Sequence, residues 1–339
     1  MQLSLPNDSV PVKEMFERFF ATESTSERVR AAEPIGFDPA LWRELIALDL
    51  PFMRVSENAG GSGMSLFDAC LMMEQAGRRL ASAPLAEAVV ALRILGELGG
   101  DVASQWMERV RDGESVLTIA LHPTVAGKPQ MVSGGAVAKG ILSFNGSEIA
   151  IEVPSQALDA PATLGGSAIG LFVPGQGERL IIASGDQAQK IWAAGIEEWK
   201  ILTAAALVGL SREALTLASE YACERVAFGQ PIGSYQGISH PLAIDVIDAD
   251  GGALLLWWTL DAIAKGDKNA AANISVLFWW ASRTARNAVA HAIQTFGGYG
   301  LSNEYDIQLY HRRAKSWAQV YGDPTAELTR GGRRLLLGE

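Results

Sequence analysis

Residues 201–228 read ILTAAALVGLSREALTLASEYACERVAF, and this stretch decides the fold class. Its apolar residues recur every three or four positions, which predicts one long amphipathic helix. Two later stretches, PLAIDVIDADGGALLLWWTLDAIA at 241–264 and NISVLFWWASRTARNAVAHAIQTF at 273–296, have the same spacing. Long helices of this kind pack antiparallel. Residues 196–339 are therefore predicted to form a C-terminal helical bundle, with Trp257, Trp258, Trp279 and Trp280 at or near its seams.

N-terminal of the bundle, the pattern changes to short β-rich runs. Between residues 115 and 183 these runs read SVLTIAL, ILSFNG, IAIEV, AIGLFV and RLIIA, and Gly, Pro, Ser and Asn separate them. Runs of this length with regular punctuation suit a compact antiparallel barrel or sandwich better than βαβ units. Residues 115–195 are predicted to form a small middle β domain.

The first third of the chain is again helical in pattern. The segments VKEMFERFF, LWRELIALDL and LFDACLMMEQAGRRLA keep their apolar residues on one helical face, and Ser65 is placed to cap the last of them. Residues 1–114 are predicted to form an N-terminal helical domain. The fold class is thus mainly α with a central small β domain.

The bulk composition excludes several classes of partner. The chain has 339 residues, a formal net charge of −10 and a pI near 5.0. That charge repels phosphate backbones, and no cluster of Lys and Arg reverses it locally, so nucleic acid is not an expected partner. His122, His240, His291 and His311 have no HxxxH or CxxC spacing, so no metal site is expected.

The sequence also predicts a cytoplasmic protein. Cys70 and Cys223 lie far apart within helical stretches and are predicted to be buried free thiols, which fits a reducing compartment. The N-terminus lacks a basic region followed by an apolar one, so no signal peptide is indicated. The most apolar run, Gly251 to Ala264, contains Asp261 and is shorter than the roughly 20 residues needed to span a bilayer. No membrane partner is expected.

The end of the first long helix carries a motif with binding chemistry. Residues 225–232 read RVAFGQPI, and Gln236 and His240 follow. Arg225 offers a forked cationic donor that suits a pyrophosphate, and Phe228 offers a flat face for a ring. The same residues also suit a plain helix C-terminus closed by Gly229, with Arg225 interacting with the helix dipole.

A second such motif follows the last long helical stretch. Residues 294–300 read QTFGGYG, with Glu304-Tyr305 and the run RRAK at 312–315 after them. Gly297 and Gly298 lack side chains, so a phosphate can approach the backbone closely, and Gln294 can hydrogen-bond an adenosine. Glycine after a helix is more often only a cap.

These two motifs and the segment LDLPFMRVSENAGGSGMSLFDACLMMEQAGRRLAS at 48–82 resemble the acyl-CoA dehydrogenase family in order, spacing and residues. The resemblance implies an N-terminal helical domain, a middle β-barrel and a C-terminal four-helix bundle. It also implies FAD as cofactor and α,β-dehydrogenation of an acyl-CoA thioester, with electron-transfer flavoprotein as the electron acceptor. In relatives the Arg and Phe of the first motif reach the FAD of a neighbouring subunit. The FAD contacts implied here are Arg225, Phe228, Gln236, Gln294, Gly297 and Gly298.

The chain departs from the family at the catalytic base. In many relatives a glutamate follows a tyrosine in a Y-E-G-T run; residues 321–325 here read YGDPT, so Gly322 takes the base position and Asp323 is the nearest carboxylate. In other relatives the base begins the helix that leads into the first motif. Counting back from Phe228 places Trp199 there, with Glu198 beside it. Asp323 and Glu198 are the candidate bases, each with an argument against it. Asp323 has a shorter side chain than glutamate, is displaced by one residue and is fixed just ahead of Pro324. For Glu198, acidic residues near a helix start are common for electrostatic reasons alone.

Two further departures concern the rest of the site. Relatives hold the flavin ring with a T-E-P-x-A-G-S-D loop and a W-x-x-N-G-type strand. In this chain, ALHPTVAG at 120–127 is only weakly similar to that loop. Arg313 stands where the R-D-A-K run of relatives usually has Asp. The retained motifs are thus those with which relatives complete a neighbour's FAD site. This pattern resembles the non-catalytic chain of heterotetrameric acyl-CoA dehydrogenases, whose substrates are often CoA thioesters of steroid side chains.

Three hypotheses remain open from the sequence. In the first, the chain completes the FAD site of a homologous partner subunit that carries the base. In the second, the chain forms a self-sufficient homo-oligomer that uses Glu198 or Asp323. In the third, it is a catalytically inactive binding or scaffold protein that reuses the fold.

Overall fold

The computed structural model describes residue 6, residues 9–113 and residues 115–338. The chain divides into two compact units. Unit 1 contains the chain up to Ser26, Cys70–Leu80 and everything from Lys200 onward, and unit 2 contains Glu27–Ala69 and Ala81–Trp199. The helices α4 (Leu66–Arg78) and α7 (Gly185–Glu224) contribute residues to both units, and so does α2 (Ser26–Ala32) by its first residue.

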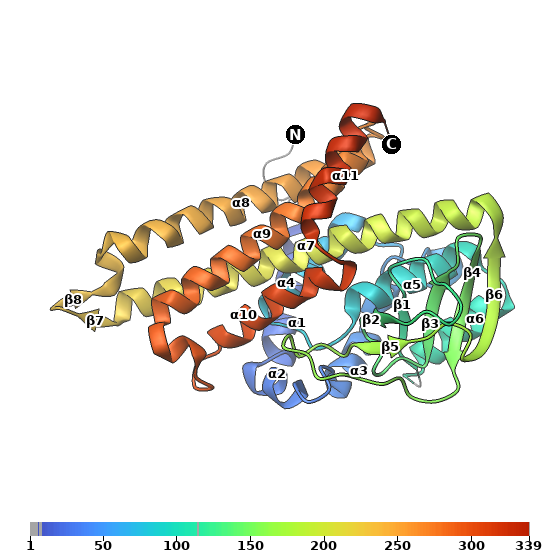
Figure 1. Ribbon diagram of the computed structural model, residues 1–339, viewed down its shortest axis with the longest axis horizontal. Coiled ribbons are helices and arrows are strands. Elements are labelled where there is room, and N and C mark those ends of the chain that lie inside the picture. Colours follow the sequence, from blue (N-terminus) through green and yellow to red (C-terminus); the bar gives the residue numbers. More distant parts are fainter. Residues whose placement is uncertain (1–5, 7–8, 114, 339) are drawn as a thin grey trace. The chain divides into compact units, whose positions relative to one another are not determined.

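Unit 1 is built from helices packed around α9 (Ala270–Phe296), which contacts α8, α10 and α11 (Figure 1). Its buried positions recur along the helix at helical spacing, as the sequence pattern predicted. The other elements of this unit are α1 (Val10–Glu23), β7 (Val226–Ala227), β8 (Gln230–Pro231), η4 (Ile232–Ser234), α8 (Gln236–Ala264), η5 (Gly297–Leu301), α10 (Ile307–Ser316), η6 (Trp317–Tyr321) and α11 (Pro324–Leu337).

Glycines let α4 and α7 touch backbone to backbone within unit 1. A Cβ atom on Gly77 would lie 1.9 Å from the carbonyl oxygen of Ala206, and one on Gly209 would lie 1.9 Å from that of Glu74. Any side chain at either position would force the helices apart. The crossing of these two helices is therefore fixed by two glycines.

A buried ion pair ties α11 to the rest of unit 1. Nζ of Lys200 lies 2.9 Å from Oε2 of Glu327, and the two side chains are 0% and 2% exposed. The hydroxyl of Ser275 on α9 donates to the same carboxylate oxygen at 3.1 Å. A fully desolvated charge needs such a partner, so α7, α9 and α11 are locked together at this point.

Unit 2 combines short helices with a sheet. Helix α5 is apolar on nearly every face and is buried over most of its length. Asp38 caps α3 by accepting from the backbone N–H groups of Ala40 and Leu41, with Pro39 in the first turn. The helices are α2 (Ser26–Ala32), α3 (Pro39–Ala47), η2 (Leu50–Phe52), η3 (Glu57–Ala59), α5 (Leu85–Leu98) and α6 (Asp101–Arg111). The strands are β1 (Leu117–Ile119), β2 (Gln130–Val132), β3 (Gly140–Phe144), β4 (Glu148–Pro154), β5 (Gly170–Phe172) and β6 (Gly177–Ser184).

The strands form a four-stranded sheet of order β1-β3-β4-β6 and a two-stranded sheet of β2 and β5. Strands β3, β4 and β6 pair antiparallel, as predicted, but β1 pairs parallel with β3, with Leu117 opposite Gly140. The expectation of a wholly antiparallel arrangement was wrong here because the long connection that contains β2 lets the chain return in the same direction.

The order of helical, β and helical segments confirms the predicted mainly α fold with a central small β domain. Ser65 caps α4, since its hydroxyl accepts from the N–H of Asp68 at 3.1 Å. Cys70 is buried as predicted, whereas Cys223 is exposed, because it lies in the last turn of α7. The predicted domain boundaries after residues 114 and 195 stay predictions.

Helix α7 is long and apolar enough, by length and composition, to cross a membrane. However, 83% of its most apolar window is buried inside the protein. This burial is that of a core helix.

Candidate functional site

The hairpin after α7 presents an exposed aromatic ring on strained backbone. Strands β7 and β8 pair antiparallel, with Ala227 opposite Gln230, so Phe228 and Gly229 form the two-residue turn. Both have positive φ, 51° for Phe228 and 86° for Gly229. The side chain of Phe228 is 97% exposed. A left-handed phenylalanine costs free energy, and the ring is almost fully exposed in the part of the chain that the structure describes. Backbone strain of this kind is concentrated at functional sites.

Hydrogen bonds hold this hairpin in place. The N–H of Ile232 donates to the carbonyl of Arg225 at 2.8 Å, and the N–H of Arg225 donates to that of Tyr221 at 2.8 Å. The phenol of Tyr235 donates to the carbonyl of Ala227 at 3.0 Å. The backbone around Arg225 is therefore fixed, although its side chain is exposed. The exposed Gln236 begins α8 directly after the hairpin.

The glycine turn after α9 offers open backbone. Gly297 has a φ of 61°, and its N–H donates to the carbonyls of Ile293 and Gln294, which closes the helix. An ideal Cβ atom on Gly297 or Gly298 would meet nothing within 4 Å. The side chain of Gln294 is exposed one turn earlier. The turn thus leaves room for a ligand to approach the main chain closely.

Aromatic rings bring the two motifs together. The Cζ atom of Arg225 lies 6.0 Å from the centre of the Tyr299 ring, within reach of a cation–π contact. The Tyr299 ring lies 5.9 Å from that of Tyr305, which in turn lies 5.2 Å from Phe296 and 5.8 Å from Tyr221. Of the predicted residues, Arg225 is thus placed against the glycine turn that follows Gln294.

The carboxylate of Asp323 caps a helix. Its carboxylate accepts from the N–H of Thr325 at 2.9 Å and so caps α11, with Pro324 in the first turn. This backbone hydrogen bond lowers the pKa of Asp323 below its ordinary value. An exposed carboxylate with a lowered pKa is a poor proton acceptor beside a thioester.

Glu198 is held by two arginines. Its carboxylate lies 3.0 Å from Nε of Arg54 and 2.9 Å from Nε of Arg93, and its side chain is 8% exposed. Both arginines belong to unit 2, so this carboxylate is engaged in ion pairs within that unit. Neither candidate base is placed as a free carboxylate in an open site.

Trp199 stands where other relatives have the catalytic base at the start of a helix, and its side chain is fully packed. It is 1% exposed, and its indole N–H donates to Oε1 of Glu87 at 3.1 Å. Burial raises the pKa of Glu87, so its neutral form is favoured beside the indole. Sequence reasoning missed Glu87; a single carboxylate inside the apolar run LAEAVVALRIL was the available signal.

Arg313, the departure from the R-D-A-K run, is buried at 2% exposure and donates from Nη1 to the carbonyl of Leu80. Tyr310, one turn earlier, donates to the carbonyl of Arg78 at 2.7 Å. These donors satisfy carbonyl groups at the C-terminal end of α4. The arginine therefore has a capping task in unit 1.

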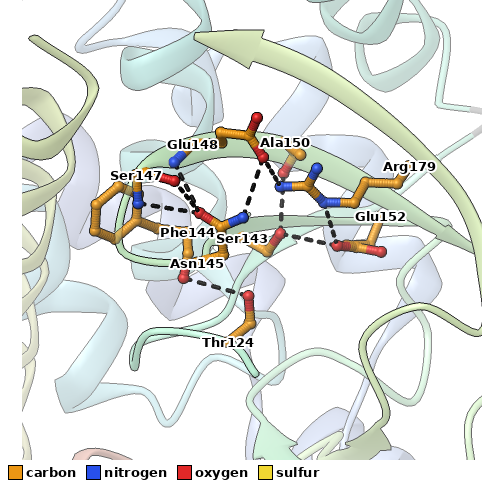
Figure 2. Close-up of polar contacts among 9 residues, drawn as sticks. All are labelled: Thr124, Ser143, Phe144, Asn145, Ser147, Glu148, Ala150, Glu152 and Arg179. Atoms are coloured by element: carbon orange, nitrogen blue, oxygen red, sulfur yellow. Dashed lines mark hydrogen bonds and ion pairs between the residues drawn. The ribbon is translucent and has the colours of Figure 1, made fainter. Parts of the chain in front are cut away.

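The middle β domain carries ion pairs on its strands. Arg179 on β6 lies 3.0 Å from Glu148 and 3.2 Å from Glu152, both on β4 (Figure 2). Asn145 closes the turn between β3 and β4 by accepting from the N–H groups of Ser147 and Glu148 (Figure 2). In the 120–127 stretch, the N–H of Thr124 donates to the carbonyl of Phe144 at 2.7 Å, and His122 is exposed.

Comparison with known proteins identifies the family. The model for the acyl-CoA dehydrogenase N-terminal domain matches residues 7–114, and the model for the acyl-CoA dehydrogenase C-terminal domain matches residues 191–336. The chain belongs to the acyl-CoA dehydrogenase family. Members of this family generally bind FAD.

Curated relatives match over nearly the whole chain. Acyl-CoA dehydrogenase IpdE2 of Mycolicibacterium smegmatis is 28% identical over 310 residues, which cover 91% of this chain and 92% of the relative. Acyl-CoA dehydrogenase FadE27 of Mycobacterium tuberculosis is 28% identical over 338 residues, covering 88% of each chain. This chain is thus similar to acyl-CoA dehydrogenases over most of its length.

Solved structures share the fold. A chain of the ChsE4-ChsE5 complex from Mycobacterium tuberculosis superposes with a TM-score of 0.86 at 24% identity and 99% coverage of both chains. A chain of the Tcur3481-Tcur3483 steroid ACAD G363A variant superposes with a TM-score of 0.83 at 24% identity and 98% coverage of both. At this identity, the superpositions show the fold alone.

Proposed function

We propose that this chain is one subunit of a heteromeric, FAD-dependent acyl-CoA dehydrogenase and completes the FAD site of a homologous partner subunit that carries the catalytic base. The observation that carries the proposal is Phe228, which is 97% exposed on left-handed backbone directly beside Arg225. Strained backbone that holds a ring this exposed among the described residues supports a contact between Phe228 and a group outside the chain.

The residues present fit a dinucleotide. Among the described residues, no carboxylate lies within ion-pair distance of Arg225, so its guanidinium is available for a pyrophosphate. Gly297 and Gly298 leave open space where a side chain would otherwise stand. Phe228 offers a ring face, and Gln236 and Gln294 offer exposed amides. We assign all six residues as FAD contacts.

The partner subunit supplies the base in this proposal. Here Asp323 caps a helix, Glu198 binds two arginines, and Trp199 fills the second family position. FAD would supply the acceptor for the hydride that leaves the β carbon of the acyl group. The residues of this chain would bind and orient the cofactor, and those of the partner would remove the α proton.

Two structures of similar fold support a heteromer. One is the ChsE4-ChsE5 complex, and the other is the Tcur3481-Tcur3483 steroid ACAD G363A variant. By this likeness we propose that the substrate is a CoA thioester of a bulky, steroid-like acid and that electron-transfer flavoprotein is the acceptor. The same likeness supports a second acyl-CoA dehydrogenase chain as the partner.

Co-expression tests the proposal. The chain alone is expected to be purified without turnover, and co-expression with the homologous chain from the same host is expected to give dehydrogenation of acyl-CoA. In that complex, Glu198→Gln and Asp323→Asn are each expected to leave turnover unchanged. Full turnover by the chain alone that is lost in either variant would establish the self-sufficient homomer instead. Absence of flavin and of turnover with every homologous partner would establish a scaffold.

A further inference from the structure

Tyr299 joins the two binding motifs in unit 1. Its ring is 49% exposed, and one side of it faces the guanidinium of Arg225 at 6.0 Å. Both the N–H and the hydroxyl of Ser302 donate to the backbone carbonyl of Tyr299, at 3.0 Å and 2.9 Å. The backbone that carries this ring is therefore held in one conformation.

A cluster of aromatic rings packs against Tyr299. Its ring lies 5.9 Å from that of Tyr305, and Tyr305 packs against Phe296 and Tyr221. The rings of Tyr221 and Phe296 stack at 4.2 Å with an interplanar angle of 18°. These rings come from α7, from α9 and from the segment before α10, so the support for Tyr299 is built by three parts of the unit.

The backbone hydrogen bonds of the hairpin do not fix the guanidinium itself. Arg225 has a long side chain whose rotamers are freely populated when it is exposed, and ordering such a side chain on binding lowers affinity. Within the described part of the chain, the guanidinium lies over the Tyr299 ring. A cation held over an aromatic face loses less freedom when it meets an anionic ligand.

We infer that Tyr299 is a positioning residue that holds the Arg225 guanidinium over the 297–301 turn, ready for the pyrophosphate of a dinucleotide. The inference rests on the proposed function, since it assigns a role within the same FAD site. Tyr299 acts through Arg225, so its contribution to FAD affinity depends on the presence of the arginine.

A double-mutant cycle in the assembled, co-purified complex tests the inference. The dissociation constant of FAD is measured for wild type, Tyr299→Leu, Arg225→Ala, the double variant and Tyr299→Phe. Tyr299→Leu is expected to weaken FAD binding about two- to five-fold, the size of an exposed cation–π contact. Tyr299→Phe keeps the ring and is expected to bind FAD as wild type does.

The effect of Tyr299→Leu in the Arg225→Ala background distinguishes a positioning role of Tyr299 from a general structural role. In the Arg225→Ala background, Tyr299→Leu is expected to have no further effect, whereas a general structural role would weaken binding there as well. Unchanged binding in Tyr299→Leu, or an equal loss with and without Arg225, overturns the inference while the proposed function stands. Unchanged binding in Arg225→Ala overturns both. Urea unfolding of each variant, expected to match wild type, excludes loss of the fold as the cause.

Discussion

Replacing Phe228 with glycine should change the stability of the chain and its contribution to FAD binding in opposite directions. A non-glycine residue in the left-handed region costs roughly 1–2 kcal/mol, and Phe228 has a φ of 51°. Replacement by glycine removes this cost but gives the unfolded chain extra freedom worth about 0.5–1 kcal/mol. Because the ring is 97% exposed, its removal loses almost no buried area. Phe228→Gly is therefore predicted to raise the free energy of unfolding by roughly 0.5–1 kcal/mol.

The same substitution is predicted to impair the cofactor site. Stacking between an aromatic side chain and a nucleobase-like ring is worth about 1–3 kcal/mol. Phe228→Gly should therefore weaken FAD binding in the assembled complex by about five-fold to 150-fold. Phe228→Ala removes the ring but keeps the left-handed strain, so it should show the same loss of FAD with no gain in stability. Phe228→Tyr keeps the ring and should behave as wild type.

Urea unfolding of the full chain and FAD titration of the co-purified complex measure the two effects. Two results would contradict this role of Phe228. One is a Phe228→Gly chain less stable than Phe228→Ala, which would show that the backbone is not strained. The other is FAD binding that is unaffected in both variants, which would show that the exposed ring has no cofactor to contact.

Three further predictions concern the carboxylates and their partners. Lys200→Met should destabilise the chain by less than the roughly 3–5 kcal/mol that an unpaired buried charge costs, because Arg330 stays 2.5 Å from the buried carboxylate of Glu327. Lys200→Met with Glu327→Leu should recover most of that loss in urea unfolding. Burial raises the pKa of Glu87 in the folded chain, so the stability it contributes is full at pH values below its ordinary value of 4.5 and declines as pH rises toward the folded value. Glu87→Gln should remove that decline when the free energy of unfolding is measured against pH; an identical slope in both proteins would contradict a raised pKa for Glu87. Asp323→Ala should lower the thermal midpoint by removing the cap of α11, Asp323→Asn should restore it, and neither should change turnover of the complex.

Much of the fold could be predicted because its signals are local. The apolar spacing of residues 201–228 and 273–296 predicted helices that the structure shows, and Ser65 caps α4 as its position indicated. The parallel pairing of β1 with β3 was missed, because strand direction depends on the course of the chain between them. The exposure of Cys223 was missed because a residue in the last turn of a helix loses its neighbours on one side.

The side-chain contacts were harder to predict from the sequence, because many of them join residues that are far apart in the chain. No local pattern predicts that Lys200 pairs with Glu327, which is 127 positions away. The ring of Tyr299 beside Arg225 and the two arginines around Glu198 likewise depend on tertiary packing. The capping task of Asp323 did have a local signal, since Asp followed by Pro is typical of a helix start.

The visible absorbance spectrum and the FAD stoichiometry of the purified protein show whether this chain needs its partner to hold FAD. The chain purified alone is compared with the same chain co-purified with its partner from the native host. The account predicts a colourless chain that retains little FAD alone and a yellow complex with tightly bound FAD. A chain that holds stoichiometric FAD by itself, with a spectrum that the partner does not alter, would contradict it.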